Sequence, residues 1–474
     1  MKKKLLIVSL IVVFPILFAA VPIPAYVILG WNDLGMHCAN KNFSKMAILP
    51  PYNNLMVQVI KKGDANTYPQ VLTSDYKVSY EVPGNTYSDG KTNFWTYVNQ
   101  LFGVSPAPNI GLTGAGLSGF MDTVDNHFQM KGIPITPYPD TDLINEHPYQ
   151  LALMKAFDVN NNLLAETQNV IPVSNEINCV SSGCHSSEQD ILDEHENTPG
   201  FNSNGPVFCA SCHADNAMGT GGGSGAPIFS RAIHHKHRNL TSDCYKCHPG
   251  PNTQCFRDVM HAQGYTCTDC HGSMNTMYSS IDAGRQPWLN EPSCGASGCH
   301  DANHSEEPNK LFRESKGHGG LYCSACHGSP HAITPTNQAN DNLQNITLQG
   351  FAGKLIECSV CHGITPTMPG PHGYMPVGIN EVPGQNPSRN GISSIYPNPS
   401  STGKIQLVFQ VKDAGSYRLV IMDINGKQIA IVAHETLKTG NYSMEINTGN
   451  YAKGTYLARL SGGKVQDVKK FIVN

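Results

Sequence analysis

Seven copies of one short cysteine–histidine motif constrain the fold of this 474-residue chain more than any other feature. Five copies read Cys-x-x-Cys-His, and two longer copies, CVSSGCH and CGASGCH, place four residues between the cysteines. The motifs use fourteen of the sixteen cysteines, so the chain must fold around whatever they bind. They are Cys179/Cys184/His185, Cys209/Cys212/His213, Cys244/Cys247/His248, Cys267/Cys270/His271, Cys294/Cys299/His300, Cys323/Cys326/His327 and Cys358/Cys361/His362.

Zinc sites, redox disulfides and covalently attached haem all use closely spaced cysteines. Structural zinc needs four tetrahedral ligands but gives no reason for a histidine directly after every second cysteine. A thioredoxin-type disulfide uses one such pair on an α/β scaffold, not seven in loop-rich sequence. In haem c, the two thiols add to the porphyrin vinyl groups and the adjacent histidine binds the iron. The motifs therefore predict seven haem c groups, with the fourteen cysteines as attachment points and the seven motif histidines as proximal ligands.

Further histidines in the same part of the chain are candidate distal ligands of the haem irons. Seven irons with two histidines each would need seven of them, and spacing assigns none to a particular iron. His318 and His261 lie only five and six residues before a motif, which favours service to a different haem. Methionine ligation at one site is a second option, for which the candidates are Met218, Met260, Met274 and Met368. The nine candidate histidines are His195, His234, His235, His237, His261, His304, His318, His331 and His372.

The N-terminus carries an export signal. It reads MKKKLLIVSLIVVFPILFAAVPIPAY, in which lysines precede an apolar run and small residues follow. This predicts a Sec signal peptide at residues 1–25, with a single membrane anchor as the alternative, because the apolar run is just long enough to span a bilayer. Export agrees with haem c, which is attached outside the cytoplasm. The net charge of −4 and the 14% of charged residues give no indication of a nucleic-acid partner.

Residues 26–175 are predicted to form a β-rich, sandwich-like domain. The segment DYKVSYEV alternates apolar and polar residues, and LALMKAFDVNNNLLAETQNVIPV predicts two strands joined by a turn at residues 160–162. Phe94, Val98 and Leu101 have helical spacing, which predicts one short helix.

The stretch GWNDLGMHC, residues 30–38, is the least conventional part of this domain. Met36, His37 and Cys38 are residue types found in copper sites, but neighbours in an extended chain point to opposite faces. We expect instead that His37 or Met36 lies near a haem of the adjoining region. Cys38 and Cys255 are the two cysteines outside the motifs, and an oxidising compartment makes them a candidate disulfide that spacing does not prove.

Residues 176–375 are predicted to be a loop-rich domain of mostly short helices. Seven porphyrins would supply much of its apolar core, so folding should depend on haem attachment, as it depends on metal in small zinc domains. The glycine-rich run at residues 219–227 reads as a surface loop, and residues 376–393 read as a Pro/Gly/Asn-rich linker.

Residues 394–474 are predicted to form a small Ig-like β-sandwich. Ile405, Leu407, Phe409 and Val411 alternate with Gln406, Val408 and Gln410, and Asn425-Gly426 marks a hairpin. The motifs YPNP, DINGK, GTYLARL and the closing KKFIV resemble the C-terminal sorting domain of type IX secretion substrates. This resemblance implies interaction with the type IX secretion machinery, passage across the outer membrane, and usually removal of the domain with attachment of the mature protein to the surface. An ordinary Ig-like adhesion module is the alternative.

The seven motifs and the surplus of histidines resemble those of multihaem c-type cytochromes, including both spacings found in small low-potential tetrahaem cytochromes. The resemblance implies stacked, mostly bis-histidine haems that pass electrons without bond chemistry and without catalytic acids or bases. We therefore expect a secreted or cell-surface electron-transfer protein that serves an extracellular acceptor or partner cytochrome. Redox partners at the outer membrane are implied, and self-assembly is an extension of this hypothesis.

Two other functions stay open at this stage. A multihaem oxidoreductase would convert a small nitrogen or sulfur compound at one open-site haem. The lysine that often replaces the motif histidine in such reductases is absent, because all seven motifs end in histidine. Alternatively, the N-terminal domain could dock a partner or a mineral while the haems serve it.

Overall fold

The structure is a computed structural model that describes residues 25–64, 67–250, 252–296, 299–300, 304–363, 371–373, 380–381, 390–400, 403–462 and 465–474. The predicted signal peptide, apart from Ala25, lies outside these residues, as do most of the predicted linker and Met368. Among the described helices, none combines the length and apolar character needed to cross a bilayer. The chain divides into two compact units, Met1–Ser293 with Glu306–Gly363, and Cys294–Ser305 with Ile364–Asn474.

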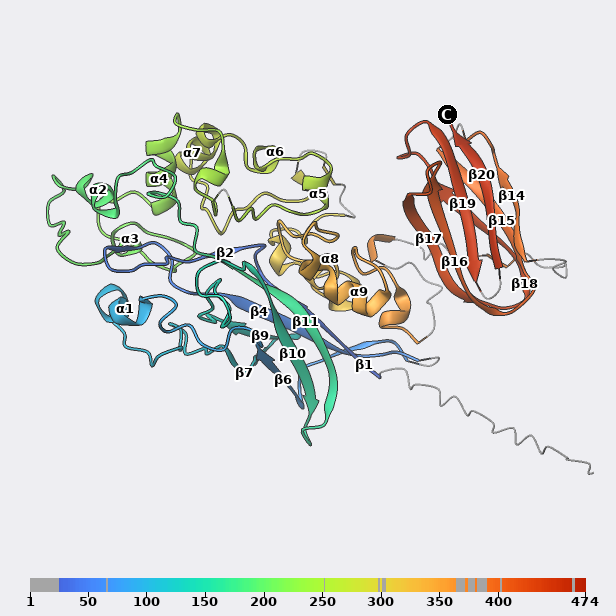
Figure 1. The fold of residues 1–474 in the computed structure, drawn as a ribbon, viewed down its shortest axis with the longest axis horizontal. Coiled ribbons are helices and arrows are strands. Elements are labelled where there is room, and N and C mark those ends of the chain that lie inside the picture. Colours follow the sequence, from blue (N-terminus) through green and yellow to red (C-terminus); the bar gives the residue numbers. More distant parts are fainter. Residues whose placement is uncertain are drawn as a thin grey trace, which may run out of the picture. The chain divides into compact units, whose positions relative to one another are not determined.

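Two five-stranded sheets form the N-terminal part of the first unit (Figure 1). The first sheet has the order β1-β4-β9-β8 with β5 beside β4: β1 (Tyr26–Trp31), β4 (Asn54–Lys61), β5 (Gln70–Leu72), β8 (Asp122–Val124) and β9 (His127–Lys131). The second has the order β2-β11-β10-β6-β7: β2 (His37–Cys38), β6 (Tyr76–Glu81), β7 (Ser118–Phe120), β10 (Tyr149–Asp158) and β11 (Leu163–Ser174).

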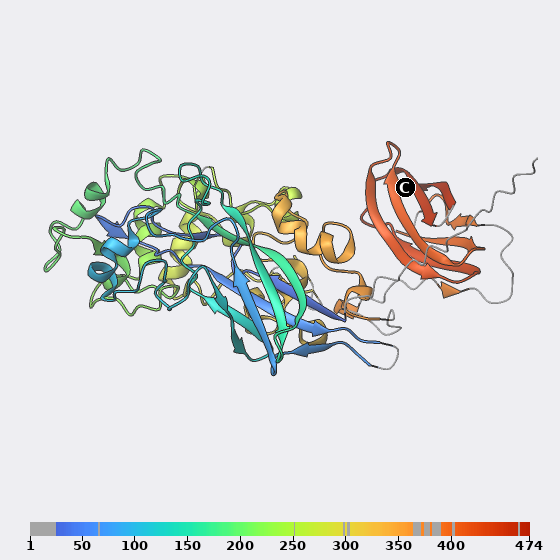
Figure 2. The same ribbon diagram turned by 60° about the horizontal axis from the view of Figure 1, so that its bottom comes forward.

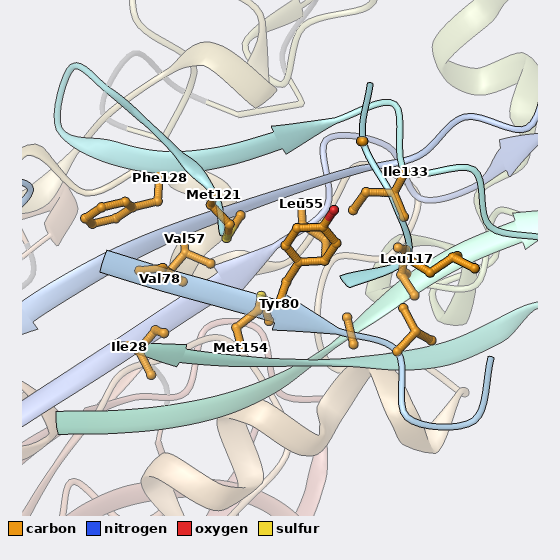
Figure 3. Packing of buried hydrophobic residues seen from close by; sticks show 14 of the residues in the cluster. Ile28, Leu55, Val57, Val78, Tyr80, Leu117, Met121, Phe128, Ile133 and Met154 are labelled. Atoms are coloured by element: carbon orange, nitrogen blue, oxygen red, sulfur yellow. The ribbon is translucent and has the colours of Figure 1, made fainter. Parts of the chain in front are cut away.

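The two sheets pack face to face around one apolar core. Leu55 of the first sheet and Tyr80 and Met154 of the second are buried in the same cluster, and Figure 3 shows them directed into the space between the sheets. The alternating pattern of DYKVSYEV predicts one buried face of Tyr76, Val78, Tyr80 and Val82. The last three are buried, and Tyr76 is partly buried against the same core. The region is therefore a β-sandwich, as the sequence indicates.

The strands β1 and β4 are buried on both faces. Ile28 belongs to the core between the sheets, whereas Val27, Leu29 and Trp31 face the opposite way and pack with Ala325 and Val360. A half-buried surface strand would expose every second residue, but only Tyr26 of β1 retains partial exposure. The sandwich thus supports the last two motifs of the first unit directly.

Local predictions for this region are confirmed. The helix α1 (Phe94–Phe102) buries Phe94, Val98 and Leu101 and ends at Gly103 in the left-handed conformation. The strands β10 and β11 pair as an antiparallel hairpin across the predicted turn. One further small sheet joins β3 (Met46–Ala47) to β12 (Val207–Phe208), which immediately precedes the second motif.

The motif-bearing region consists of short helices and long loops, drawn in green to orange in Figure 1 and seen from a second side in Figure 2. Only seven apolar residues between positions 179 and 363 are buried among those described, which is too few for a protein core of this size. Its helices are α2 (Glu188–Asp193), α3 (Cys209–Cys212), α4 (Phe229–His237), η1 (Cys244–Lys246), α5 (Val259–Ala262), α6 (Cys267–His271), α7 (Met274–Asp282), η3 (Phe312–Glu314), η4 (His318–Gly320), α8 (Cys323–His327), η5 (Ala339–Asn342), α9 (Leu343–Gln349) and η6 (Cys358–Val360).

The second unit contains a separate β-sandwich with its own core. One sheet has the order β13-β18-β15-β14 and the other β17-β16-β19-β20. The alternation at residues 405–411 is confirmed, since all four predicted residues are buried in the core cluster. The predicted hairpin at Asn425-Gly426 joins β16 to β17. The elements are η7 (Pro371–Gly373), β13 (Asn380–Glu381), β14 (Gly391–Tyr396), β15 (Lys404–Val411), β16 (Gly415–Asp423), β17 (Gln428–Leu437), β18 (Gly440–Asn447), β19 (Gly454–Gly462) and β20 (Val465–Val473).

Candidate metal centres

The first, second, third and seventh motifs share one local geometry, in which the amide of the histidine bonds back to the carbonyl oxygen of the first cysteine. In the short motifs the amide of His213 donates to the carbonyl oxygen of Cys209 at 3.0 Å, and His248 donates to Cys244 at 2.9 Å. In the long motif CVSSGCH, the amide of His185 donates to the carbonyl oxygen of Cys179 at 3.1 Å. The two additional residues therefore enlarge the loop without changing which groups close it.

The two cysteines of a motif lie in different environments, a difference that their spacing does not indicate. All seven first cysteines are half-buried, but in the first five motifs the second cysteine is exposed. The exposed cysteines are Cys184, Cys212, Cys247, Cys270 and Cys299. The polypeptide around these motifs buries few apolar side chains, so it does not enclose the second thiol by itself. These five residues are therefore not part of a site closed by protein atoms, and their role as haem attachment points stays a prediction.

The second cysteines of the last two motifs differ from those of the first five. Cys326 and Cys361 are half-buried, and Cys361 packs against the apolar cluster that contains Trp31 of β1. Burial raises the pKa of the Cys326 thiol to about 12 and that of Cys361 to about 11. The sandwich therefore covers attachment points that the short helices and loops of the earlier motifs leave exposed.

Five motif histidines each face one histidine from outside the motifs. The distances between the ring centres fall in the narrow range of 6.0–6.2 Å. All the outer rings of these pairs belong to the set of nine candidate distal ligands. The pairs are His185–His237, His213–His195, His248–His234, His271–His331 and His362–His318.

This separation is the one expected for two imidazoles that bind opposite sides of one metal ion. A metal–nitrogen bond is about 2 Å long and the ring centre lies about 1 Å further on, so two such rings have centres roughly 6 Å apart. Direct ring stacking gives a shorter separation, as in the 5.0 Å between His304 and His372. The ring-centre distances of the five pairs are therefore compatible with an ion between the rings, although His213–Phe229 at 6.1 Å shows that the distance alone does not require one.

The number of protein ligands at each pair fits a metal held by a macrocycle. Within the described part of the chain, no group of three or more His, Cys, Asp or Glu side chains is arranged to hold a bare ion. Each pair brings two imidazole rings together next to two motif cysteines, which suits an iron whose other four ligands come from a porphyrin. The residues present therefore fit haem c.

Hydrogen bonds fix the orientation of several of these rings. The Nδ1 atom of His213 lies 2.8 Å from the carbonyl oxygen of Pro227, that of His234 2.7 Å from Ser230, and that of His237 2.8 Å from Ile233. A carbonyl oxygen only accepts, so each Nδ1 carries the proton and donates it. The other nitrogen, Nε2, is left as the metal-binding atom, which is the usual outer-shell arrangement for a ligating histidine.

The environment of the rings favours the neutral form that a metal ligand requires. Burial lowers the pKa of His248 and His331 to about 4. Burial also lowers the pKa of His234, His271 and His362 below the usual range. These imidazoles are therefore unprotonated at neutral pH.

Neighbouring pairs share chain segments. His234 and His237 lie one turn apart on α4 and face motif histidines of the third and first motifs. His327 and His331 lie in one short segment, although His331 faces the histidine of the fourth motif. Thiols of different motifs also lie near each other: burial, and then the neighbouring Cys244 of the third motif, raise the pKa of Cys267 of the fourth.

The remaining candidate ligands are placed in several environments. His235 packs on Tyr278 with ring centres 4.8 Å apart, and His261 meets the ring of Phe256 at 5.5 Å. The distal positions of the motifs ending at His300 and His327 stay predictions. A cavity of about 240 Å³ lies beside the first motif, lined by Asn40, Lys41, Asn42, Met46, Asn175, Ile177, Cys179, Val180, Ser181, Glu188 and Ile191.

The stretch at residues 30–38 forms a hydrogen-bonded network and not a cluster of metal ligands. His37 Nε2 lies 2.9 Å from Asp33 Oδ1, and Asn54 Nδ2 donates to Asp33 Oδ2 at 2.7 Å. Although burial acts in the opposite direction, His37 and Asn54 hold the pKa of Asp33 below its usual range. The network fastens this stretch to β4, a role that residue spacing alone did not indicate.

Cys38 and Cys255 lie near each other as free thiols. Burial, and then the neighbouring Cys255, raise the pKa of the Cys38 thiol to about 12. Arg257 Nη1 donates both to the carbonyl oxygen of Cys255 at 2.9 Å and to that of Gly35 at 2.7 Å, which holds the two segments together. A disulfide between them stays a prediction.

The sandwich also holds the loop that carries His318. Asn126 Nδ2 donates to the carbonyl oxygen of Gly320 at 2.7 Å, and Gln58 Nε2 donates to the same oxygen at 3.1 Å. Gln58 Oε1 accepts from the amide of Tyr322 at 3.0 Å. Strand β4 and the turn before β9 therefore fix a segment that contributes one of the paired rings.

Comparison with known proteins identifies the C-terminal sandwich. The family model of the secretion system C-terminal sorting domain matches residues 394–474. No curated protein matched the chain. The second unit therefore carries a C-terminal sorting domain of the type IX secretion system, as its motifs indicate. The protein is exported to the cell surface or the extracellular space and interacts with the secretion machinery.

Proposed function

We propose that this protein is a cell-surface multihaem c-type cytochrome that carries electrons through seven covalently attached haems to an extracellular acceptor or partner cytochrome. The observation that carries the proposal is the set of five histidine pairs at 6.0–6.2 Å. Each pair combines one motif histidine with one outer histidine, which neither a disulfide framework nor a solvent-exposed histidine cluster would require.

The proximity of successive centres supports a continuous path for electrons. The second motif lies beside the first, because the Cys209 thiol is within electrostatic reach of Cys179. The first and third motifs receive their outer histidines from the same helix, α4. The Cys244–Cys267 contact links the third motif to the fourth. In space the first motif therefore neighbours both the second and the third, and the third neighbours the fourth.

The path continues into the last two motifs of the first unit. His331 faces His271 of the fourth motif and lies only four residues after His327 of the sixth. The Cys326 thiol of the sixth motif is in turn within electrostatic reach of Cys361 of the seventh. The fifth motif belongs to the second unit and is not placed in this series.

The chemistry expected of these sites is electron transfer without bond making. When bound, haem supplies an iron that alternates between the ferric and ferrous states. The paired histidines would hold the iron, and backbone carbonyl oxygens would keep the rings of His213, His234 and His237 oriented toward it. Two histidine ligands favour a low potential and leave no open coordination position. Export to the surface places such a carrier where electrons leave the cell.

The test begins with the haem content of the secreted protein and its reaction with carbon monoxide. We expect seven haems per chain by pyridine haemochrome analysis, and an unchanged low-spin spectrum when carbon monoxide is added to the dithionite-reduced protein. The His234→Ala variant is the control for sensitivity, since it should expose about one-seventh of the haem to carbon monoxide.

The outcomes separate the hypotheses. Secreted protein without covalently bound haem would overturn the proposal. Carbon monoxide binding by about one-seventh of the haem in the unaltered protein would favour the open-site oxidoreductase and direct the search to a small nitrogen or sulfur substrate. A low-spin protein that reduces insoluble ferric oxide would support the electron carrier.

A further inference from the structure

We infer that the stretch at residues 30–38 positions the His331 ring, with Gly35 setting how closely the His331 loop can approach the sandwich. This inference rests on the proposed function, because it assigns His331 as the outer ligand of the fourth motif. It gives the N-terminal sandwich a role in coordination at a site to which it contributes no ligand.

The backbone of His331 is held in an unfavourable conformation. Its φ angle is +63°, in the left-handed region that is unfavourable for a residue with a side chain. The carbonyl oxygen of His331 accepts a hydrogen bond from the amide of Arg257 at 3.0 Å. A ring on such a backbone needs contacts from its surroundings to stay opposite His271.

Gly35 lies close to this loop. A Cβ atom added at Gly35 would collide with the carbonyl oxygen of Pro330 and would lie only 2.9 Å from Cβ of His331. Just before this point, Ser329 Oγ donates to the carbonyl oxygen of Asn32 at 2.8 Å. The loop that carries His331 therefore contacts the stretch at residues 30–38 in two ways: Gly35 lies close to Pro330, and Ser329 donates a hydrogen bond to Asn32.

Arg257 locks the other side of the loop. Its guanidinium binds Asp341 through Nε at 2.6 Å and through Nη2 at 2.9 Å, and Nη1 donates to the carbonyl oxygen of Gly35. The guanidinium also lies over the ring of Tyr149 at 4.5 Å. Because the Arg257 amide binds His331, one residue connects the ligand loop, the sandwich and η5.

Hydrogen bonds hold the stretch at residues 30–38 in place, so this stretch resists displacement. Asp33 is joined to His37 and to Asn54, and Asn32 Nδ2 donates to Asn53 Oδ1 at 2.7 Å. These bonds fasten both sides of Gly35 to the sheet. An added methyl group at Gly35 should therefore move Pro330 and His331, the partners outside the sheet.

The test compares Gly35→Ala with Gly84→Ala in the haem-loaded, full-length protein. Gly84 lies in the same domain, and a Cβ added there meets no atom within 4 Å. We expect Gly35→Ala to make about one-seventh of the haem high-spin in the oxidised state and reactive with carbon monoxide, and Gly84→Ala to change nothing. Added imidazole should restore the low-spin spectrum of Gly35→Ala.

A double variant separates positioning from general damage. If Gly35 acts only through the ligand ring, Gly35→Ala combined with His331→Ala should give no more high-spin haem than His331→Ala alone. Additive effects, or a Gly35→Ala spectrum identical to the unaltered protein, would overturn the inference. If the unaltered protein carries no covalently bound haem, that result would instead overturn the proposed function.

If the Gly35→Ala protein does not accumulate, the Ser329→Ala variant tests the same inference. It removes only the hydrogen bond to Asn32, so we expect a smaller high-spin fraction and faster hydrogen exchange at the Arg257 amide, whose acceptor is His331. Unchanged coordination and unchanged exchange in Ser329→Ala would count against the inference.

Discussion

At the scale of single residues, Arg257 and Asp341 form a buried ion pair, and Arg257 also bonds to the carbonyl oxygens of Gly35 and His331. Only 3% and 6% of the two side chains are exposed, and their contact is bidentate. Taking such charges out of water is costly, so removal of one partner leaves the other uncompensated.

Asp341→Asn should therefore lower the free energy of unfolding by about 3–5 kcal/mol, measured by guanidinium unfolding of the haem-loaded protein. The comparison is Lys310→Gln, which breaks a pair with Glu307 whose side chains are 45% and 36% exposed and should cost about 0–1 kcal/mol. If the two substitutions lower the free energy of unfolding equally, burial does not determine how much these ion pairs stabilise the protein.

Some residue-level features could be predicted from the sequence and others could not. The spacing of the motifs gives the closure of the histidine over the first cysteine, because both groups lie in one short segment. The partner of each ring depends on tertiary packing: His318 lies next to the sixth motif in sequence but faces His362 of the seventh. The close approach of Gly35 to Pro330 joins segments almost three hundred residues apart, so no local pattern reveals it.

At the scale of elements, helix α4 is the part of the motif region with the largest consequences. It presents His234 and His237 to two different motif histidines, and the ion pair between Arg231 and Asp282 braces it against α7. The sequence HHKH, with histidines one helical turn apart, is a signal that one helix serves two sites.

A break in α4 should therefore open two sites together. Ala232→Pro removes the hydrogen bond from the Ala232 amide to the carbonyl oxygen of Ile228, 3.0 Å long. We expect about two-sevenths of the haem to bind carbon monoxide, against about one-seventh in His234→Ala. Ala232→Ser keeps the amide and is the control. A single opened site in Ala232→Pro would show that the two rings are held independently.

At the scale of the whole molecule, the protein cores and the motif region are stabilised differently. The cores of both sandwiches consist of apolar side chains from their own strands. The motif region between positions 179 and 363 buries few apolar residues among those described. Composition and motif density predict this contrast, although they do not indicate that β1 and β4 are also covered by the motif region.

Protein produced without haem attachment should therefore lose order selectively. Limited proteolysis is expected to cut within residues 179–363 and to leave fragments from both sandwiches, identified by mass spectrometry. The haem-loaded protein, digested in parallel, should resist in all three regions. If the motif region resists proteolysis equally well with and without haem, its polypeptide contacts suffice for folding.

The sorting domain makes a prediction for the cell. Deletion of residues 394–474 should prevent display at the cell surface and leave the haem protein inside the outer membrane, because the signal for the second translocation step is lost. Protease treatment of intact cells, followed by haem staining, measures this. The Gly84→Ala variant, which retains the domain, should remain accessible to protease.

The shared histidines also set an order for maturation during export. The ring that faces His185 belongs to His237, and the ring that faces His271 belongs to His331, so each partner leaves the translocon well after its motif. If haem is attached to the first motif, it would lack its outer histidine, His237, until α4 has emerged and folded. One motif with its haem is then not a separable module. Moving one motif into another protein would leave an outer histidine without the motif histidine that it faces. The pairs His185–His237 and His271–His331 thus tie the first and fourth motifs to parts of the first unit that follow them in the chain.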